Sequence, residues 1–137
     1  YEFMSGTSMA TPQMAGVSAV VLQRVENDPL FASMSARQKI DVVQNLIMGT
    51  ATPVVDPLQD TGAPYSPRKQ GSGLTNVLAA TTSSVYPTVV GAPEQSRPKA
   101  DLGDGTKGWH FDVTLHNLSG VPATYELSSQ ALSEIVD

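Results

Sequence analysis

The sequence contains no cysteine, so neither disulfide bonds nor thiolate chemistry can take part in its folding or function. Basic residues are also few: 8 Lys and Arg stand against 13 Asp and Glu, and the formal net charge is −5 at pH 7. No run of Lys and Arg is available to neutralise phosphates. The charge balance therefore argues against binding to nucleic acid or to an acidic membrane surface.

Long apolar runs are absent as well. No stretch approaches the ~18 apolar residues that cross a bilayer, so no membrane span is expected, and no segment has the layout of a signal peptide. The first residue is Tyr1 rather than Met, which leaves a leader farther upstream open. Hydrophobic residues make up 40% of the 137 positions, which is ordinary for a packed globular chain and too apolar for disorder.

The first part of the sequence is helical in pattern. Small residues surround the larger apolar ones from Thr7 to about Arg24, and this predicts a helix that neighbours approach closely and that is central and largely buried. Ser35 and Gln38 form a capping box ahead of an apolar stripe. This pattern predicts a second helix, with Gly49 as the C′ residue that ends it.

The segment that follows the second helix is rich in Pro and Gly. Residues 52–73 are therefore predicted to form an extended, irregular surface segment. A third, short helix is expected to begin near Thr75, where the pattern becomes helical again.

After Thr82 the pattern changes to that of strands. Residues 85–90 are typical of a strand, and residues 109–116 alternate apolar and polar side chains as a half-buried strand does, with the polar positions in solvent. Residues 123–132 are a further strand candidate. Helices followed by strands favour two domains joined near residues 82–86 over a single α/β unit.

The stretch SGTSMATPQMAG, residues 5–16, places Ser8 at the start of the first predicted helix. A serine hydroxyl is a poor nucleophile unless a base takes its proton and donors stabilise the oxyanion that forms. A helix N-terminus supplies donors through its free amides and its dipole, and Gly6 permits a close backbone approach. Serine is also a preferred helix cap, so physics alone favours capping as the role of Ser8.

Residues 6–16, GTSMATPQMAG, resemble the nucleophile motif of the subtilisin-like serine proteases (subtilases, peptidase family S8), and every fixed position of G-T-S-M-[AS]-x-P-x-x-A-G is met. Residues 65–80, YSPRKQGSGLTNVLAA, are similar to the end of the catalytic domain in cell-envelope subtilases of the lactocepin and C5a-peptidase type. In those proteins a fibronectin-III-like domain follows, and residues 111–127 resemble its early strands more loosely.

The resemblance implies a fold and a division into domains. Residues 1–82 would be the C-terminal part of an α/β subtilisin-like catalytic domain, represented mainly by its helices. Residues 83–137 would begin an all-β fibronectin-III-like sandwich that is incomplete here. The parent protein would be a bacterial enzyme, extracellular or attached to the cell wall, that hydrolyses peptide bonds in protein or peptide substrates.

The resemblance also implies roles for individual residues. Ser8 would attack the scissile carbonyl, with its own backbone amide as one donor to the oxyanion. Gly6, Thr7 and Met9 would flank the active site, and Met9 would be prone to oxidation beside the nucleophile.

In this family the triad runs in the order Asp, His, Ser, and residues 1–7 contain neither Asp nor His. The chain alone is therefore expected to be inactive and to need the upstream part of the catalytic domain. No metal or cofactor is expected in this chain, and calcium is left open for the parent. Without parallel strands beside the first helix, we expect exposed apolar surface and either self-association, association with another chain, or marginal stability.

Other polar residues are weaker candidates for chemistry. His110 and His116 flank Asp112 on the predicted strand, which could suggest a base or a metal site. The regular alternation favours ordinary solvent-facing positions, and we reject both histidines as triad members. Asp101 and Asp104 lack the ligand spacing of a calcium loop and are typical of a turn.

Two alternatives to a protease remain open. One is a noncatalytic surface-binding or adhesion protein that keeps the subtilase scaffold without a working triad. The other is a complete small domain in which Ser8 is only a helix cap. Intact Asp and His motifs upstream would favour the protease over the first alternative.

Overall fold

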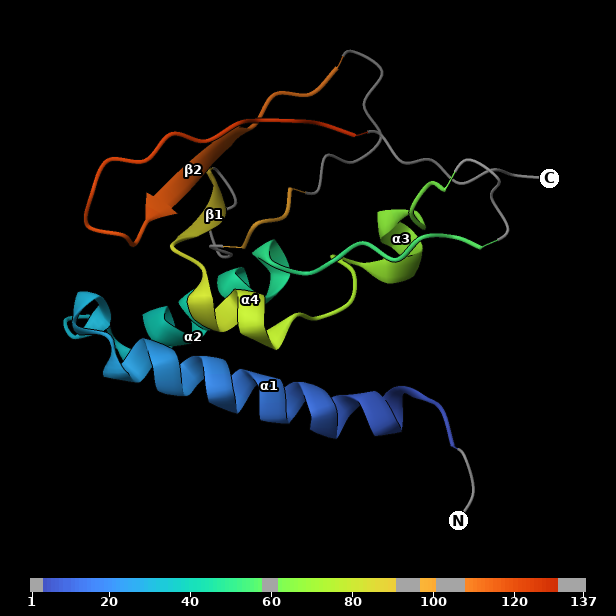
Figure 1. Ribbon diagram of the computed structural model, residues 1–137, viewed down its shortest axis with the longest axis horizontal. Helices are drawn as coiled ribbons and strands as arrows, with labels where there is room; N and C mark the ends of the chain where they lie inside the picture. The colour runs from blue at the N-terminus through green and yellow to red at the C-terminus, as the bar shows by residue number, and fades with distance from the viewer. Residues whose placement is uncertain (1–3, 58–61, 91–96, 101–107, 131–137) are drawn as a thin grey trace.

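The computed structural model describes residues 4–57, 62–90, 97–100 and 108–130. Figure 1 shows the arrangement of the helices and strands in this part of the chain. In chain order the elements are α1 (Thr7–Asn27), the 3-10 helix η1 (Pro29–Phe31), α2 (Ala36–Gly49), α3 (Pro67–Gln70), α4 (Val77–Thr82), β1 (Val85–Val90) and β2 (Asp112–Asn117). The three predicted helices and the predicted strand at residues 85–90 are confirmed, whereas the strand predicted at residues 109–116 begins only at Asp112. Of the candidate at residues 123–132, residues 123–130 form no strand, and residues 131–132 lie outside the described residues.

The elements form layers. Helices α2 and α4 lie between the long helix α1 and the two-stranded sheet, as Figure 1 shows. Strands β1 and β2 pair antiparallel, with Val85 opposite Asn117 and Val90 opposite Asp112. Among the described residues from 83 onward, the strands form only this one antiparallel pair. The fibronectin-III-like sandwich and the boundary after residue 82 stay predictions.

The core lies where α1, η1, α2, α4 and β1 meet. Its buried apolar residues are Val21, Val25, Phe31, Val42, Val43, Leu46, Ile47, Ala80 and Tyr86. Leu46 of α2 is fully buried, and the neighbouring elements supply aliphatic and aromatic groups to the same cluster. Burial of this apolar surface is the main favourable contribution to the folding of the described residues.

Only the C-terminal half of α1 takes part in this core. Val21 and Val25 are fully buried, whereas residues 7–16 are all exposed. The prediction of a largely buried helix is therefore wrong for the first half, because no described element packs against it. In Figure 1 this end of α1 runs out beyond α2 and α4. The exposed apolar surface that we expected is present there, with Met9 and Met14 at 36% and 37% exposure.

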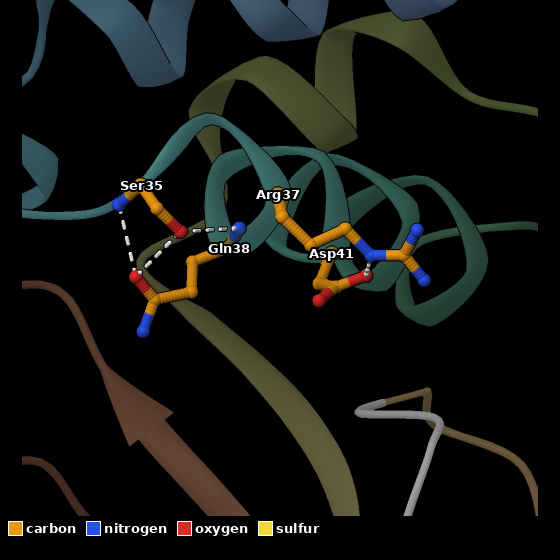
Figure 2. A network of polar contacts seen from close by, with 4 residues as sticks. All are labelled: Ser35, Arg37, Gln38 and Asp41. Carbon is orange, nitrogen blue, oxygen red and sulfur yellow. Dashed lines mark hydrogen bonds and ion pairs between the residues drawn. The ribbon is translucent and has the colours of Figure 1, made fainter.

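Helix α2 begins as its sequence predicts. The Ser35 backbone amide donates to Gln38 Oε1 at 2.9 Å, and the Gln38 amide donates to Ser35 Oγ at 3.4 Å, which completes the capping box seen in Figure 2. These two bonds satisfy amides that a helix start leaves without partners. The capping box predicted from the sequence is thus confirmed.

Helix α2 ends differently from the prediction. Gly49 is its last helical residue rather than the C′ residue, and Thr50 is the C-cap, with its hydroxyl donating to the Leu46 carbonyl at 2.7 Å. A Cβ atom at position 49 would lie 2.9 Å from Pro87 Cδ. Glycine is therefore needed here because strand β1 approaches the helix closely, and this contact is not visible in the local sequence.

Residues 52–57 and 62–74 are joined by a few polar contacts around α3. Thr52 and Leu74 form an isolated antiparallel bridge. The side-chain amide of Gln70 joins two further backbone segments: its Oε1 accepts from the Val54 amide at 2.6 Å, and its Nε2 donates to the Tyr65 carbonyl. The prediction of an irregular segment is correct in outline for the described residues, while residues 58–61 lie outside them. The segment contains the short helix α3, and Gln70, the last residue of α3, makes these two hydrogen bonds.

Helix α4 starts two residues later than the position near Thr75 that we expected. Asn76 is its N-cap, and the Asn76 Oδ1 atom accepts from the Ala79 amide at 2.9 Å. At its other end, α4 is tied to α1 by Arg24, whose Nη1 and Nη2 atoms donate to the carbonyls of Ala80 at 2.9 Å and Ser83 at 2.6 Å. A guanidinium satisfies carbonyls that a helix end leaves open and complements its dipole.

The face of the β2 region that is exposed to solvent is the opposite of the predicted one. The apolar residues Phe111, Val113 and Leu115 are 47%, 51% and 47% exposed, whereas His116 is half-buried. The reason is that Tyr86 of β1, opposite His116 in the register, belongs to the core. The polar face of β2 therefore turns toward α2, and no described element covers the apolar face.

We expect Gly73→Ala to destabilise the fold more than Gly71→Ala. Both glycines have positive φ, 114° and 63°, so each alanine costs about 1–2 kcal/mol in backbone strain. At position 73 the new Cβ would also lie 2.4 Å from the Thr52 carbonyl oxygen, whereas at position 71 nothing lies within 4 Å. Steric crowding should add roughly 1–3 kcal/mol, measurable by urea unfolding. Equal losses in the two variants would contradict the close approach.

Arg24→Met should lower the free energy of unfolding by about 2–3 kcal/mol, because two carbonyls lose a charged donor. The matched control is Arg37→Met on α2, which removes only an exposed pair with Asp41 at 3.6 Å. That change should cost no more than about 0.5 kcal/mol. Chemical denaturation of both variants makes the comparison, and a loss as small for Arg24→Met as for the control would refute its role.

Candidate active site

The predicted site residues lie together in the first turn of α1. Gly6 is the N-cap, with φ 155° and ψ 170°, and Thr7 and Ser8 are the first two helical residues. The Gly6 carbonyl accepts from the amides of Met9 at 3.0 Å and Ala10 at 3.1 Å. No side chain caps this helix end. The capping role that physics alone favoured for Ser8 is therefore contradicted.

The backbone amide of Ser8 is available to a ligand. None of the described residues provides an acceptor for it, because Ser8 lies in the first turn, where the amides have no helical carbonyl one turn earlier. Such an amide adds its own partial positive charge to that of the helix dipole. It is therefore suited to stabilise negative charge that develops beside Ser8.

The hydroxyl of Ser8 is equally accessible. Gly6, Thr7, Ser8 and Met9 are all exposed, and no described side chain hydrogen-bonds the Ser8 hydroxyl. The nearby Thr11 hydroxyl is occupied, since it donates to the Thr7 carbonyl at 2.8 Å. The arrangement thus presents one free hydroxyl beside one free amide, and a base brought by another segment would be needed to activate the hydroxyl.

The two histidines lie elsewhere. His110 is 91% exposed, and its Nε2 atom lies 3.6 Å from the Asp112 carboxylate. His116 of β2 is half-buried, and its ring stacks on Tyr86 with centroids 4.4 Å apart and an angle of 8° between the planes. In Figure 1 the first turn of α1 and strand β2, to which His116 belongs, lie on opposite sides of α2 and α4.

The solvent-facing position predicted for His110 is confirmed, but the same prediction is wrong for His116. The His116 Nε2 atom shares a hydrogen bond of 2.9 Å with the Thr88 hydroxyl of β1. Burial lowers the pKa of His116 and raises the pKa of the Tyr86 hydroxyl. The polar environment of this pair escaped the sequence analysis because it depends on which face of the hairpin packs on α2. The sequence did offer one signal of this environment: Tyr86 and Thr88 are two residues apart on the predicted strand, so their side chains lie on the same face.

No metal site is evident where the structure can be described. In residues 4–57, 62–90, 97–100 and 108–130, no three His, Asp or Glu side chains form a group that could hold a metal ion. Asp101 and Asp104 lie outside these ranges. Within the same part of the chain, no helix combines the length and the apolar composition needed to cross a bilayer.

Comparisons with known proteins concern both halves of the chain. The profile described as the subtilase family matches residues 1–73. The C5a peptidase of Streptococcus pyogenes is 27% identical over 137 residues, which is 100% of this chain and 11% of that protein. The PII-type proteinase of Lactococcus lactis subsp. cremoris is 34% identical over 136 residues, covering 94% of this chain and 7% of that protein. The chain thus spans about a tenth or less of the length of these relatives.

Acidification should destabilise the fold through His116. Because burial lowers the pKa of its imidazole below the usual 6.5, the unfolded chain binds the proton at a higher pH than the folded chain does. The contribution of the neutral ring is therefore present above pH 6.5 and is lost as the pH falls through the interval below it. Tyr86, which faces the ring, does not titrate in this range because burial raises its pKa.

Urea unfolding at about pH 7.5 and about pH 5.5 measures this effect, because stability depends on the difference in bound protons between the two states. In His116→Gln the loss of stability on acidification should be smaller than in the unmodified chain. His110→Gln is the matched control, since that ring is 91% exposed, and it should leave the loss unchanged. An identical pH response in both variants would show that His116 does not contribute.

Proposed function

The chain belongs to the subtilase family, and from this premise we propose that it is the nucleophile-bearing part of a serine endopeptidase. The observation that carries the proposal is the free hydroxyl of Ser8 beside its own free amide at the start of α1, inside the segment that the family profile matches. The names of the relatives, peptidase and proteinase, support the same reaction class.

In the proposed mechanism the Ser8 oxygen forms a bond to the carbonyl carbon of the scissile peptide while a histidine takes the hydroxyl proton. The Ser8 amide donates to the oxyanion of the tetrahedral intermediate. The histidine then gives its proton to the departing amine, the carbon–nitrogen bond breaks, and an acyl-enzyme remains. Water, activated by the same base, releases the acid product and restores the serine.

The remaining members of the triad come, in this proposal, from the upstream part of the catalytic domain. A histidine there acts as the general base, an aspartate orients it, and an asparagine completes the oxyanion hole. The chain alone is then inactive, and its first partner is that upstream part. Gly6, Thr7 and Met9 flank the site, where the exposed thioether of Met9 is open to oxidation.

The proposal also assigns the two parts of the chain. Residues 1–82 close the catalytic domain, and residues 83–137 begin a fibronectin-III-like domain, an assignment supported by the antiparallel pairing that starts at Val85. The parent protein acts on protein or peptide substrates outside the bacterial cell or at its wall, and calcium remains open as a ligand of the parent. The exposed first half of α1 provides surface for the upstream part, or for self-association when that part is absent.

A fluorophosphonate probe applied to the full-length protein tests the assignment of Ser8. Because only an activated serine reacts readily, peptide mass spectrometry should find the adduct on the peptide that contains Ser8. Ser8→Ala should abolish both labelling and peptide-bond hydrolysis. Ser5→Ala is the matched control, an exposed serine of the same segment, and it should leave labelling intact.

The absence of an adduct on folded, propeptide-free protein would refute the proposal. It would favour the alternative function, a noncatalytic surface-binding or adhesion protein on a degenerate subtilase scaffold. Labelling that persists in Ser8→Ala would instead show that another serine is the nucleophile.

A further inference from the structure

Helix α1 carries Ser8 in its first turn, whereas its contacts with the core lie much later in the helix. Among the described residues, Val17 is the member of the core cluster nearest to Ser8 along α1, and it is only partly buried. Ser8 lies nine residues earlier, which is about 13 Å along the axis at the usual rise of an α-helix. The placement of Ser8 therefore depends on contacts that restrain the stretch before Val17.

A hydrogen bond joins this stretch to a distant part of the chain. The Thr75 hydroxyl donates to the Met14 Sδ atom at 3.2 Å. The Thr11 hydroxyl, by contrast, stays within its own helix and donates to the Thr7 carbonyl at 2.8 Å. Thr75 thus restrains the exposed half of α1 from outside the helix.

Thr75 is itself held in place. On one side of it, Leu74 and Thr52 exchange two backbone hydrogen bonds of 2.8 Å each. On the other side, Asn76 caps α4, and its Oδ1 atom accepts from the Ala79 amide at 2.9 Å. Thr75 is half-buried between these two neighbours. Its hydroxyl therefore projects from a backbone that is fixed on both sides.

The threonines of α4 use their hydroxyls differently. The Thr81 hydroxyl donates to the Val77 carbonyl at 2.8 Å, and the Thr82 hydroxyl donates to the Leu78 carbonyl at 2.7 Å. Both bonds lie within α4 and are the usual local bonds of a helical threonine. Thr75 precedes α4 and has no earlier turn of that helix to bond. Its hydroxyl is therefore free to bond α1.

A movement at Met14 is enlarged at Ser8. Helix α1 is continuous from Thr7 to Asn27. Met14 lies three residues before Val17 and Ser8 lies nine, so a tilt about Val17 moves Ser8 about three times as far as Met14. A thioether is a weak acceptor, so the bond contributes little to stability. Its effect on rate is larger, because a displacement of about 1 Å at the reacting groups can cost about 100-fold.

We propose that Thr75 is a positioning residue for Ser8. Through Met14, its hydroxyl fixes the direction of the first half of α1 and so sets where the Ser8 hydroxyl lies relative to the base. This inference rests on the nucleophilic role proposed for Ser8. Thr75 touches no reacting group, and its contribution is to the attack step rather than to substrate binding.

Thr75→Val in the full-length protein removes the hydroxyl and keeps the shape of the side chain. The kcat for peptide hydrolysis should fall about fivefold or more, with KM unchanged. Thr75→Ser keeps the hydroxyl and should restore kcat. Thr82→Val is the matched control, because that exposed hydroxyl bonds only within α4, and it should leave kcat unchanged. An equal kcat loss in Thr75→Val and Thr82→Val would overturn the proposal.

Met14→Leu removes the acceptor and nearly conserves the volume. It should lower kcat as Thr75→Val does. Adding Thr75→Val to Met14→Leu should cause no further loss, because the two side chains make one shared interaction. If the second substitution lowers kcat as much as it does in the unmodified protein, Thr75 acts independently of Met14 and the proposal is overturned.

A readout that needs no activity separates this inference from the proposed function. Met9 adjoins Ser8 in the first turn of α1, and its 13C-labelled methyl signal, assigned through Met9→Leu, reports where that turn lies. In the full-length protein, Thr75→Val should shift the Met9 signal and Thr75→Ser should return it. A Met9 signal that does not move overturns the positioning role, whatever the activity.

Failure of the proposed function has a different signature. In that case the unmodified full-length protein neither hydrolyses peptides nor reacts with the fluorophosphonate probe. A Met9 shift in Thr75→Val would then still show that Thr75 places the first turn of α1, whereas the catalytic meaning of that placement would be lost with the function itself.

Discussion

The hydrogen bonds of Arg24 to the carbonyls of Ala80 and Ser83 are the link on which the arrangement of the described residues depends. They join the long helix α1 to the end of α4 at the point where the chain passes into β1. Together with the burial of Val21 and Val25, they fix the C-terminal half of α1. The first half, which carries Ser8, extends beyond this point, and Met14 receives a hydrogen bond of 3.2 Å there from the Thr75 hydroxyl.

Features encoded by neighbouring residues could be predicted from the sequence. The capping box of Ser35 and Gln38 forms as expected, because both of its hydrogen bonds lie within four residues. The start of α1 at Thr7 likewise follows from local pattern. Gly49 could not be interpreted in this way, since the reason for a glycine there is Pro87, which lies on a strand that packs from a distance.

In the candidate site, too, some features are set by neighbouring residues and others by distant segments. The motif around Ser8 predicted a helix start with a usable hydroxyl and amide, and both lie within one turn of the helix. The residues of the helix alone predicted burial, because burial of a helix depends on what other segments cover it; the exposed surface was expected only from the lack of parallel strands beside it. The same limit explains why the packing of His116 on Tyr86 was missed: alternation shows that a strand has two faces, but not which face the rest of the chain contacts.

The two hydrogen bonds of the Gln70 side chain restrict which residue can occupy position 70. The oxygen of its primary amide accepts from the Val54 amide, and the nitrogen donates to the Tyr65 carbonyl. Each end of the side chain is therefore paired with a group of opposite polarity. Glutamate has nearly the same shape, but when ionised it is an acceptor at both ends and would set two oxygens against each other at Tyr65. The loop is thus closed by the polarity of a single side chain, a property that size and hydrophilicity do not capture.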